Sequence, residues 1–104
     1  MAAFITDIHS KQEYINILSD FKAQRAKEYG INRMGIFGSV ARGEQSKKSD
    51  LDIYFEGDAI SLFKIVALKD ELERLLHCTV DIVRLRKSMN EVLKNRIEKE
   101  GIYV

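Results

Sequence analysis

One strand–helix–strand segment in the second half of the chain restricts the fold more than any other feature. Leu51, Ile53 and Phe55 alternate with polar or aromatic residues, which is the period of a strand with one buried face. An amphipathic helix is predicted from about Ile60 to His77, and a β-branched strand from Thr79 to Leu85. The apolar stripe of this helix consists of Ile65, Leu68, Leu72, Leu75 and Leu76. The segment therefore predicts a crossover unit with parallel strands and a right-handed connection.

The elements before this unit add a helix and an antiparallel strand. Ser10 and Glu13 have the spacing of a capping box, which predicts a helix start at this point. A strand is predicted over residues 31–37, and Gly30 before it suits the end of a helix. The connection from this strand to Leu51 is too short for a crossover helix, so the two strands are expected to be antiparallel.

The elements after the unit complete an α/β (α+β) fold. Ser88 and Glu91 repeat the capping-box spacing and predict the start of a last helix, which Gly101 is expected to end. Residues 102–104 could form a last short strand. We therefore predict one domain over residues 1–104, with a small mixed sheet of three to four strands backed by helices.

Composition excludes several classes of protein. A chain of 104 residues fits one small domain, and 45% hydrophobic with 32% charged residues is typical of a globular protein. The formal net charge of +1 gives no support for binding long nucleic acids. Cys78 is the sole cysteine, which rules out an internal disulfide. Because no long apolar run or signal peptide is visible, we expect a cytoplasmic protein without a membrane partner.

A glycine turn follows the first predicted strand. Backbone N–H groups at Gly38 and Ser39 are placed to approach an anion, and Arg42 adds a fixed positive charge. A plain tight turn with a capping serine explains the same residues. The glycine spacing matches a Walker A loop, but Glu44 and Gln45 stand where that loop needs Lys and Ser or Thr, so a Walker A loop is rejected.

Three aspartates lie on the two strands of the crossover unit. Asp50 and Asp52 share one face of a strand, where their carboxylates can reach the same hard cations. Asp81 lies within the β-branched strand, where an aspartate is unfavourable unless it is paired, exposed or bound to metal. The alternative is that all three simply face water. Three carboxylates on neighbouring strands beside a phosphate-binding turn favour a catalytic site.

The combined motif resembles the nucleotidyltransferase superfamily that includes DNA polymerase beta. The length of the chain and the order of its elements are similar to those of the smallest branch, the minimal nucleotidyltransferase (MNT) proteins. The motif runs from Gly38-Ser39-x-x-Arg42-Gly43 through Ser49-Asp50-x-Asp52 to Asp81. The resemblance implies the polymerase-beta-like fold and transfer of AMP from ATP with two Mg²⁺ ions. It implies metal ligands at the three aspartates, with catalytic roles there. It also implies phosphate binding by Gly38 and Ser39, assisted by Arg42.

Members of the MNT branch commonly act as antitoxins that bind a helical HEPN ribonuclease, and in some cases attach AMP to its tyrosine. The resemblance therefore implies a HEPN-domain partner. Three alternatives stay open from the sequence. The first is a non-catalytic antitoxin that masks its partner by binding. The second is a nucleotidyltransferase with a small-molecule or RNA acceptor. The third is an α/β domain whose aspartates are only surface residues.

Overall fold

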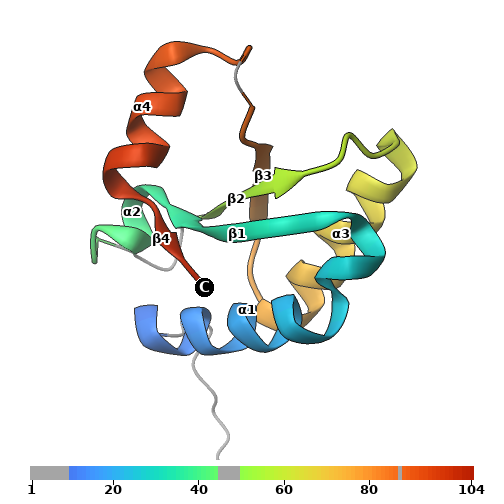
Figure 1. Cartoon of the computed structure of the whole chain (residues 1–104). Helices are drawn as coiled ribbons and strands as arrows, with labels where there is room; N and C mark the ends of the chain where they lie inside the picture. The colour runs from blue at the N-terminus through green and yellow to red at the C-terminus, as the bar shows by residue number, and fades with distance from the viewer. Residues whose placement is uncertain (1–9, 45–49, 87) are drawn as a thin grey trace, which may run out of the picture.

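Four strands form one mixed sheet in the order β3-β2-β1-β4, with helices on both of its faces (Figure 1). This structure is a computed structural model, and it describes residues 10–44, 50–86 and 88–104. The elements are α1 (Lys11–Arg25), η1 (Ala26–Tyr29), β1 (Ile31–Phe37), α2 (Gly38–Ala41), β2 (Leu51–Gly57), α3 (Leu62–Leu76), β3 (Val80–Arg84), α4 (Glu91–Glu100) and β4 (Ile102–Tyr103). The predicted α/β class with a mixed sheet is confirmed.

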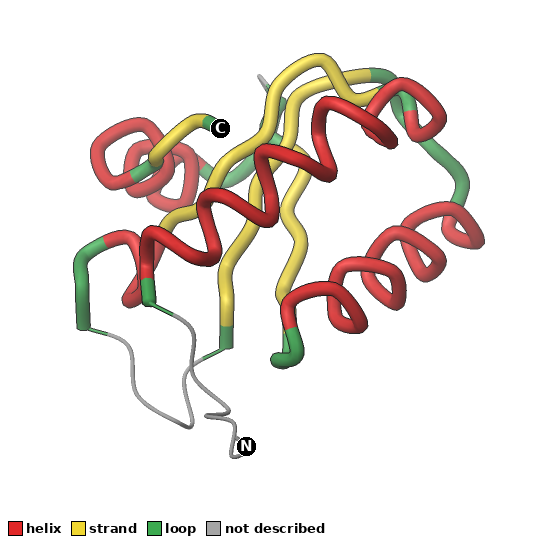
Figure 2. Tube along the Cα trace, turned by 90° about the horizontal axis from the view of Figure 1, so that it is seen from below, coloured by secondary structure: helices red, strands yellow, loops and turns green. Residues whose placement is uncertain are grey.

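The strand pairing agrees with the directions that the connection lengths predict. β1 pairs antiparallel with β2 and with β4, whereas β2 and β3 run parallel on either side of the α3 crossover. The short final strand is therefore confirmed, and it closes the β1 edge of the sheet. In the tube view α1 crosses the strands while α3 packs beside β3 (Figure 2).

The two faces of the sheet support two separate apolar cores. The larger core lies under α1 and α3 and includes Leu18, Ile53 and Leu72, each fully buried. A smaller core on the opposite face joins Phe37 and Tyr54 to Ile97 of α4. Alternation along each strand assigns successive side chains to opposite faces, so β2 contributes Ile53 to one core and Tyr54 to the other.

Most of the predicted helix boundaries hold, and one is wrong. The Ser10–Glu13 capping box is present at the start of α1, and Gly30 has the left-handed conformation (φ 69°) that ends η1. α4, however, begins after Asn90 rather than at a box formed by Ser88 and Glu91. The Asn90 side chain accepts hydrogen bonds from two backbone N–H groups of the first turn, which satisfies these donors without a serine cap.

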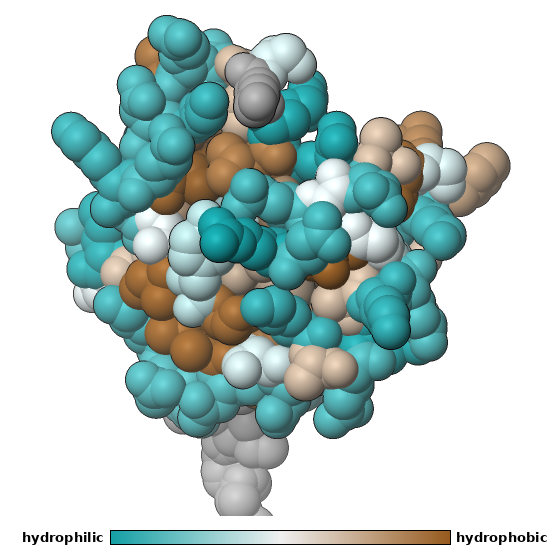
Figure 3. Space-filling view, viewed as in Figure 1, coloured by the Kyte–Doolittle hydropathy of each residue, from teal (hydrophilic) through white to brown (hydrophobic). Residues whose placement is uncertain are grey.

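The predicted apolar stripe of α3 is correct in its centre and wrong at Leu75. Leu68, Leu72 and Leu76 are buried, but Leu75 is 43% exposed because it lies one position off the face that contacts the sheet. The start of α3 also exposes apolar side chains, at the upper right corner where Figure 3 shows tan and brown surface. Leu62 and Phe63 are 77% and 89% exposed there.

No helix within residues 10–44, 50–86 and 88–104 is long and apolar enough to cross a membrane. Ser49 of the aspartate motif and Gln45–Lys48 of the preceding loop lie outside the described residues, so the prediction of a polar loop there is not assessed.

Candidate active site

The sheet register brings two of the predicted aspartates together. Asp52 of β2 is the direct partner of Asp81 on the parallel strand β3, so both side chains belong to the same face, the face that α4 covers in part. Asp52 is half-buried, while Asp50 and Asp81 are exposed. Asp50 directly precedes β2 and lies two residues before Asp52. The sequence prediction of neighbouring aspartate strands therefore corresponds to a real juxtaposition.

The glycine turn adjoins this aspartate face through Gly38. Asp52 pairs with Phe37 across the β1–β2 ladder, which places the next residue of the turn beside the Asp52 carboxylate. A Cβ atom on Gly38 would lie 2.1 Å from Asp52 Oδ2, and Gly38 has a φ of +78°. The backbone conformation favours glycine at this position, and a Cβ atom here would force the Asp52 carboxylate to move. Ser39 follows in the first turn of α2, where backbone N–H groups lack acceptors within the helix.

The electrostatics of the face centre on Asp52. Burial raises the pKa of the Asp52 carboxyl above its usual range, and the nearby charges of Asp81 and Asp50 raise this pKa further. The positive charges of Arg96 and Arg42 lower the same pKa and partly oppose these effects. Asp52 therefore experiences both other aspartates, and this crowding of negative charge is the condition that a bound cation relieves.

A cluster of charged side chains joins α2 to α4 beside this face. Arg42 Nη1 donates to Glu100 Oε1 at 2.9 Å, and Arg42 Nε donates to Glu44 Oε1 at 3.0 Å. Arg96 Nε lies 3.8 Å from the same Glu100 oxygen, and its guanidinium carbon lies 5.9 Å from the centre of the Phe37 ring. The sequence motifs identify Arg42 but neither Arg96 nor Glu100, since both belong to α4 and Glu100 lies 58 residues further along the chain than Arg42.

The donor chemistry of the aspartate face suits magnesium, which binds oxygen ligands and especially carboxylates. Among the described residues, however, no three His, Cys, Asp or Glu side chains are grouped closely enough to hold a metal ion. The three aspartates share a face and interact electrostatically, but they do not form a closed metal centre in this arrangement. Their role as metal ligands stays a prediction.

Comparison with known proteins identifies the family. The model of the family described as polymerase beta nucleotidyltransferase matches residues 20–104. The chain belongs to this family. It is also 34% identical to the protein adenylyltransferase MntA of Thermococcus cleftensis over 94 residues, which are 89% of this chain and 94% of that protein. The predicted nucleotidyltransferase activity class and the resemblance to the MNT branch are thereby confirmed.

Solved structures of toxin–antitoxin proteins share the fold of this nucleotidyltransferase. A crystal structure of a toxin–antitoxin with AMP-PNP has 26% identity and a TM-score of 0.67, covering 91% of this chain and 72% of that chain. A Shewanella oneidensis structure of an MNT antitoxin in complex with a tri-AMPylated HEPN toxin has 24% identity and a TM-score of 0.63. It covers 89% of this chain and 70% of that chain, and at this identity the likeness concerns the fold alone.

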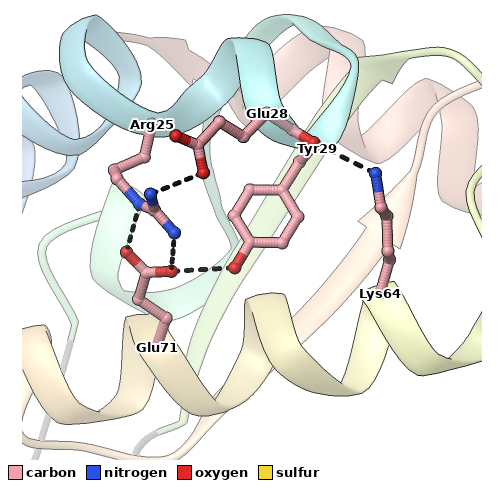
Figure 4. Close-up of polar contacts among 5 residues, drawn as sticks. All are labelled: Arg25, Glu28, Tyr29, Lys64 and Glu71. Carbon is pink, nitrogen blue, oxygen red and sulfur yellow. Dashed lines mark hydrogen bonds and ion pairs between the residues drawn. The ribbon is translucent and has the colours of Figure 1, made fainter.

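The opposite face of the nucleotidyltransferase carries a second charged cluster and a shallow cavity. Glu71 of α3 accepts hydrogen bonds from Arg25 Nε at 2.9 Å, Arg25 Nη2 at 3.1 Å and the Tyr29 hydroxyl at 2.8 Å (Figure 4). A cavity of about 290 Å³ between α1 and α3 is lined by Ile17, Asp20, Phe21, Gln24, Arg25, Glu71 and Leu75. This cluster joins the two helices and lies across the sheet from the aspartates.

Proposed function

We propose that this nucleotidyltransferase transfers AMP from ATP to a hydroxyl of a HEPN-domain toxin, most simply a tyrosine, and so acts as its antitoxin in the cytoplasm. The observation that carries the proposal is the pairing of Asp52 with Asp81 beside Gly38. Paired carboxylates next to an anion-binding turn are the chemistry that phosphoryl-group transfer requires. The exposure of Asp50 and Asp81 leaves this face open to a partner protein.

The residues divide the work of binding. Asp50 and Asp52 would hold two Mg²⁺ ions, and Asp81 would complete the second of these sites. Such ions, when bound, neutralise charge on the phosphate oxygens and on the leaving group. The backbone N–H groups at Gly38 and Ser39 would bind the β- and γ-phosphates, with Arg42 nearby as a fixed cation. The triphosphate would thus be held along the glycine turn with its α-phosphorus toward the aspartates.

The transfer itself needs an oriented hydroxyl and a proton acceptor. Asp81, the more exposed carboxylate of the pair, would take the proton as the acceptor oxygen bonds to the α-phosphorus. The bond between the α-phosphorus and the bridging oxygen breaks, and pyrophosphate leaves. Positioning and neutralisation of charge dominate such a reaction, so a small domain with a few well-placed groups is sufficient.

The relatives support the class of substrate and of partner. The Thermococcus relative is named as a protein adenylyltransferase, which favours a protein acceptor over a small molecule. The toxin–antitoxin structure with AMP-PNP holds an ATP analogue, which favours ATP as the nucleotide. The Shewanella complex, similar in fold, contains an AMPylated HEPN toxin, the partner class that we propose.

The test is transfer of label from ATP marked at the α-phosphate. The protein is incubated with Mg²⁺ and the HEPN-domain protein encoded beside its gene, and the tyrosine is located by mass spectrometry. We expect label on the partner with the wild type and none with Asp52→Asn. The control Asp70→Asn changes an exposed aspartate of α3 and should act like the wild type. A bound but unlabelled partner would refute the transfer. Full neutralisation of the toxin by Asp52→Asn would favour masking instead.

A further inference from the structure

We infer that Arg96 of α4, which no sequence motif identifies, binds the polyphosphate of the nucleotide together with Arg42. The inference rests on the proposed function and extends it to the α4 side of the site. α4 contacts α2 in the structure, and Figure 1 shows the two helices next to each other beyond the end of β1. This arrangement places an arginine from the C-terminal part of the chain beside the glycine turn.

The guanidinium of Arg96 lies near an aromatic ring next to the glycine turn. Its guanidinium lies 5.9 Å from the centre of the Phe37 ring, and Phe37 is only 3% exposed. Phe37 is both the residue before Gly38 and the ladder partner of Asp52. A guanidinium near this ring is therefore close to the residue that links the turn to the aspartate face, at a distance where a cation–π interaction is favourable. The same proximity explains its electrostatic effect on Asp52.

The donors of Arg96 are available for a ligand. Its ion pair to Glu100 measures 3.8 Å, which is longer than a hydrogen bond. Within the part of the chain that the structure describes, the guanidinium makes no hydrogen bond, and the side chain is 47% exposed. Five N–H donors remain in a geometry that matches phosphate oxygens. A structural arginine such as Arg25, by contrast, uses three of its nitrogens in hydrogen bonds.

The Glu100 carboxylate offsets the positive charges of Arg42 and Arg96 when no ligand is bound. Its Oε1 atom lies 2.9 Å from Arg42 and 3.8 Å from Arg96, so one carboxylate oxygen compensates both cations. Its side chain is 25% exposed, which places this shared charge partly inside the protein. A triphosphate carries several negative charges and can replace this single carboxylate as the partner of both guanidiniums. An uncharged nucleoside has no such advantage.

Binding of three probes by titration calorimetry tests the inference. The probes are AMP-PNP and sodium tripolyphosphate, each with Mg²⁺, and adenosine alone. We expect Arg96→Gln to weaken the binding of AMP-PNP and tripolyphosphate by roughly tenfold to a hundredfold, the loss typical of a charged hydrogen bond. The affinity for adenosine should not change. Arg96→Lys keeps the positive charge but lacks the planar set of donors of a guanidinium, so its affinity for the two phosphate probes should be intermediate. Arg74→Gln is the matched control, since Arg74 also pairs with a carboxylate four residues away, on α3.

The outcomes separate this inference from the proposed function. Wild-type binding of AMP-PNP combined with unchanged affinity in Arg96→Gln overturns the role of Arg96 and leaves the proposed function intact. A wild type that binds neither AMP-PNP nor tripolyphosphate overturns the proposed function itself. In the labelling reaction, Arg96→Gln should raise the KM for ATP by the same factor as it weakens tripolyphosphate. A lower kcat with an unchanged KM would contradict binding of ATP by Arg96 before the reaction, because such a change means the loss of an interaction made only in the transition state.

Discussion

Two arginine–glutamate clusters on opposite faces of the sheet use the same residue types in different ways. In the first, which joins α1 and η1 to α3, the Glu71 carboxylate accepts three hydrogen bonds of 2.8–3.1 Å from Arg25 and Tyr29. In the second, between α2 and α4, a single oxygen of Glu100 faces two arginines, one at 2.9 Å and one at 3.8 Å. In the first cluster three nitrogens of Arg25 are used in hydrogen bonds. In the second, Arg96 makes no hydrogen bond to the residues that the structure describes.

The acidic groups near the two clusters differ in the same sense. The hydrogen bonds from Arg25 hold the pKa of Glu71 below its usual range, which means that the fold favours its charged form. Burial and the neighbouring aspartates raise the pKa of Asp52, so the fold disfavours its charged form. The charge of Glu71 thus stabilises the fold on one face of the sheet, whereas on the other face the charges of the aspartates repel one another. Such repulsion is characteristic of sites that bind an ion or a ligand.

The largest effect that distinguishes the two faces is expected for Asp52→Asn. The substitution removes a carboxylate from the paired aspartates, so adenylyl transfer should fall by at least about a thousandfold. Stability should not fall, because the change also removes a partly buried charge that repels its neighbours. The measurements are labelled transfer and the urea midpoint of unfolding. A marked loss of stability would show that Asp52 supports the fold instead.

The next largest effect on transfer is expected for Gly38→Ala, with Gly43→Ala as its control. The two glycines have almost equal backbone conformations. Gly38 and Gly43 have φ values of +78° and +77°, but a Cβ on Gly38 would meet Asp52 whereas a Cβ on Gly43 meets nothing within 4 Å. The left-handed conformation alone should cost alanine about 1–2 kcal/mol at either position. Gly38→Ala should also displace the carboxylate and lower transfer about a hundredfold, while Gly43→Ala keeps its activity. Equal activities in the two variants would contradict the close approach.

On the opposite face, Tyr29→Phe should lower stability and leave catalysis unchanged. The hydroxyl donates to Glu71 at 2.8 Å from a residue that is 7% exposed. Loss of one such hydrogen bond should reduce the free energy of unfolding by about 1 kcal/mol. Thermal unfolding monitored by circular dichroism measures this loss, with transfer assayed on the same preparation. A change in the KM for ATP would indicate that the two faces are coupled.

Local patterns in the sequence were sufficient for most of the fold. The alternation around Ile53 and the capping box at Ser10 predicted a strand and a helix that the structure confirms, since both depend on residues close in sequence. The start of α4 was mispredicted because Ser88 and Asn90 both suit a cap, and spacing alone does not choose between them. Leu75 was misassigned because its exposure depends on the angle at which α3 packs.

The site was predictable only where a motif carries it. Asp52 and Asp81 follow from the strand pattern and the crossover, which together place them on adjacent strands. Their direct pairing depends on the register, and no local signal sets this register. Arg96 and Glu100 look like ordinary surface charges on an amphipathic helix. Their relation to Arg42 exists only because the C-terminal helix returns to the glycine turn, which is a property of the tertiary structure.

The smallest expected effect is on the pH dependence of stability, and its sign separates the two faces. Glu71 has a lowered pKa, so its stabilising effect is full above the ordinary value of 4.5 and is lost as the pH falls through the lower folded value. Asp52 has a pKa raised from 3.8, so its destabilising effect is present at neutral pH and is relieved as the pH falls through the higher folded value. Urea midpoints are measured in EDTA from pH 7 to about pH 3. As the pH falls, the midpoints of Glu71→Gln and Asp52→Asn should both move toward the wild-type midpoint, the first from below and the second from above. Glu71→Gln should start below the wild type and Asp52→Asn level with it or above. If both variants started below it, the repulsion assigned to the aspartate face would be wrong.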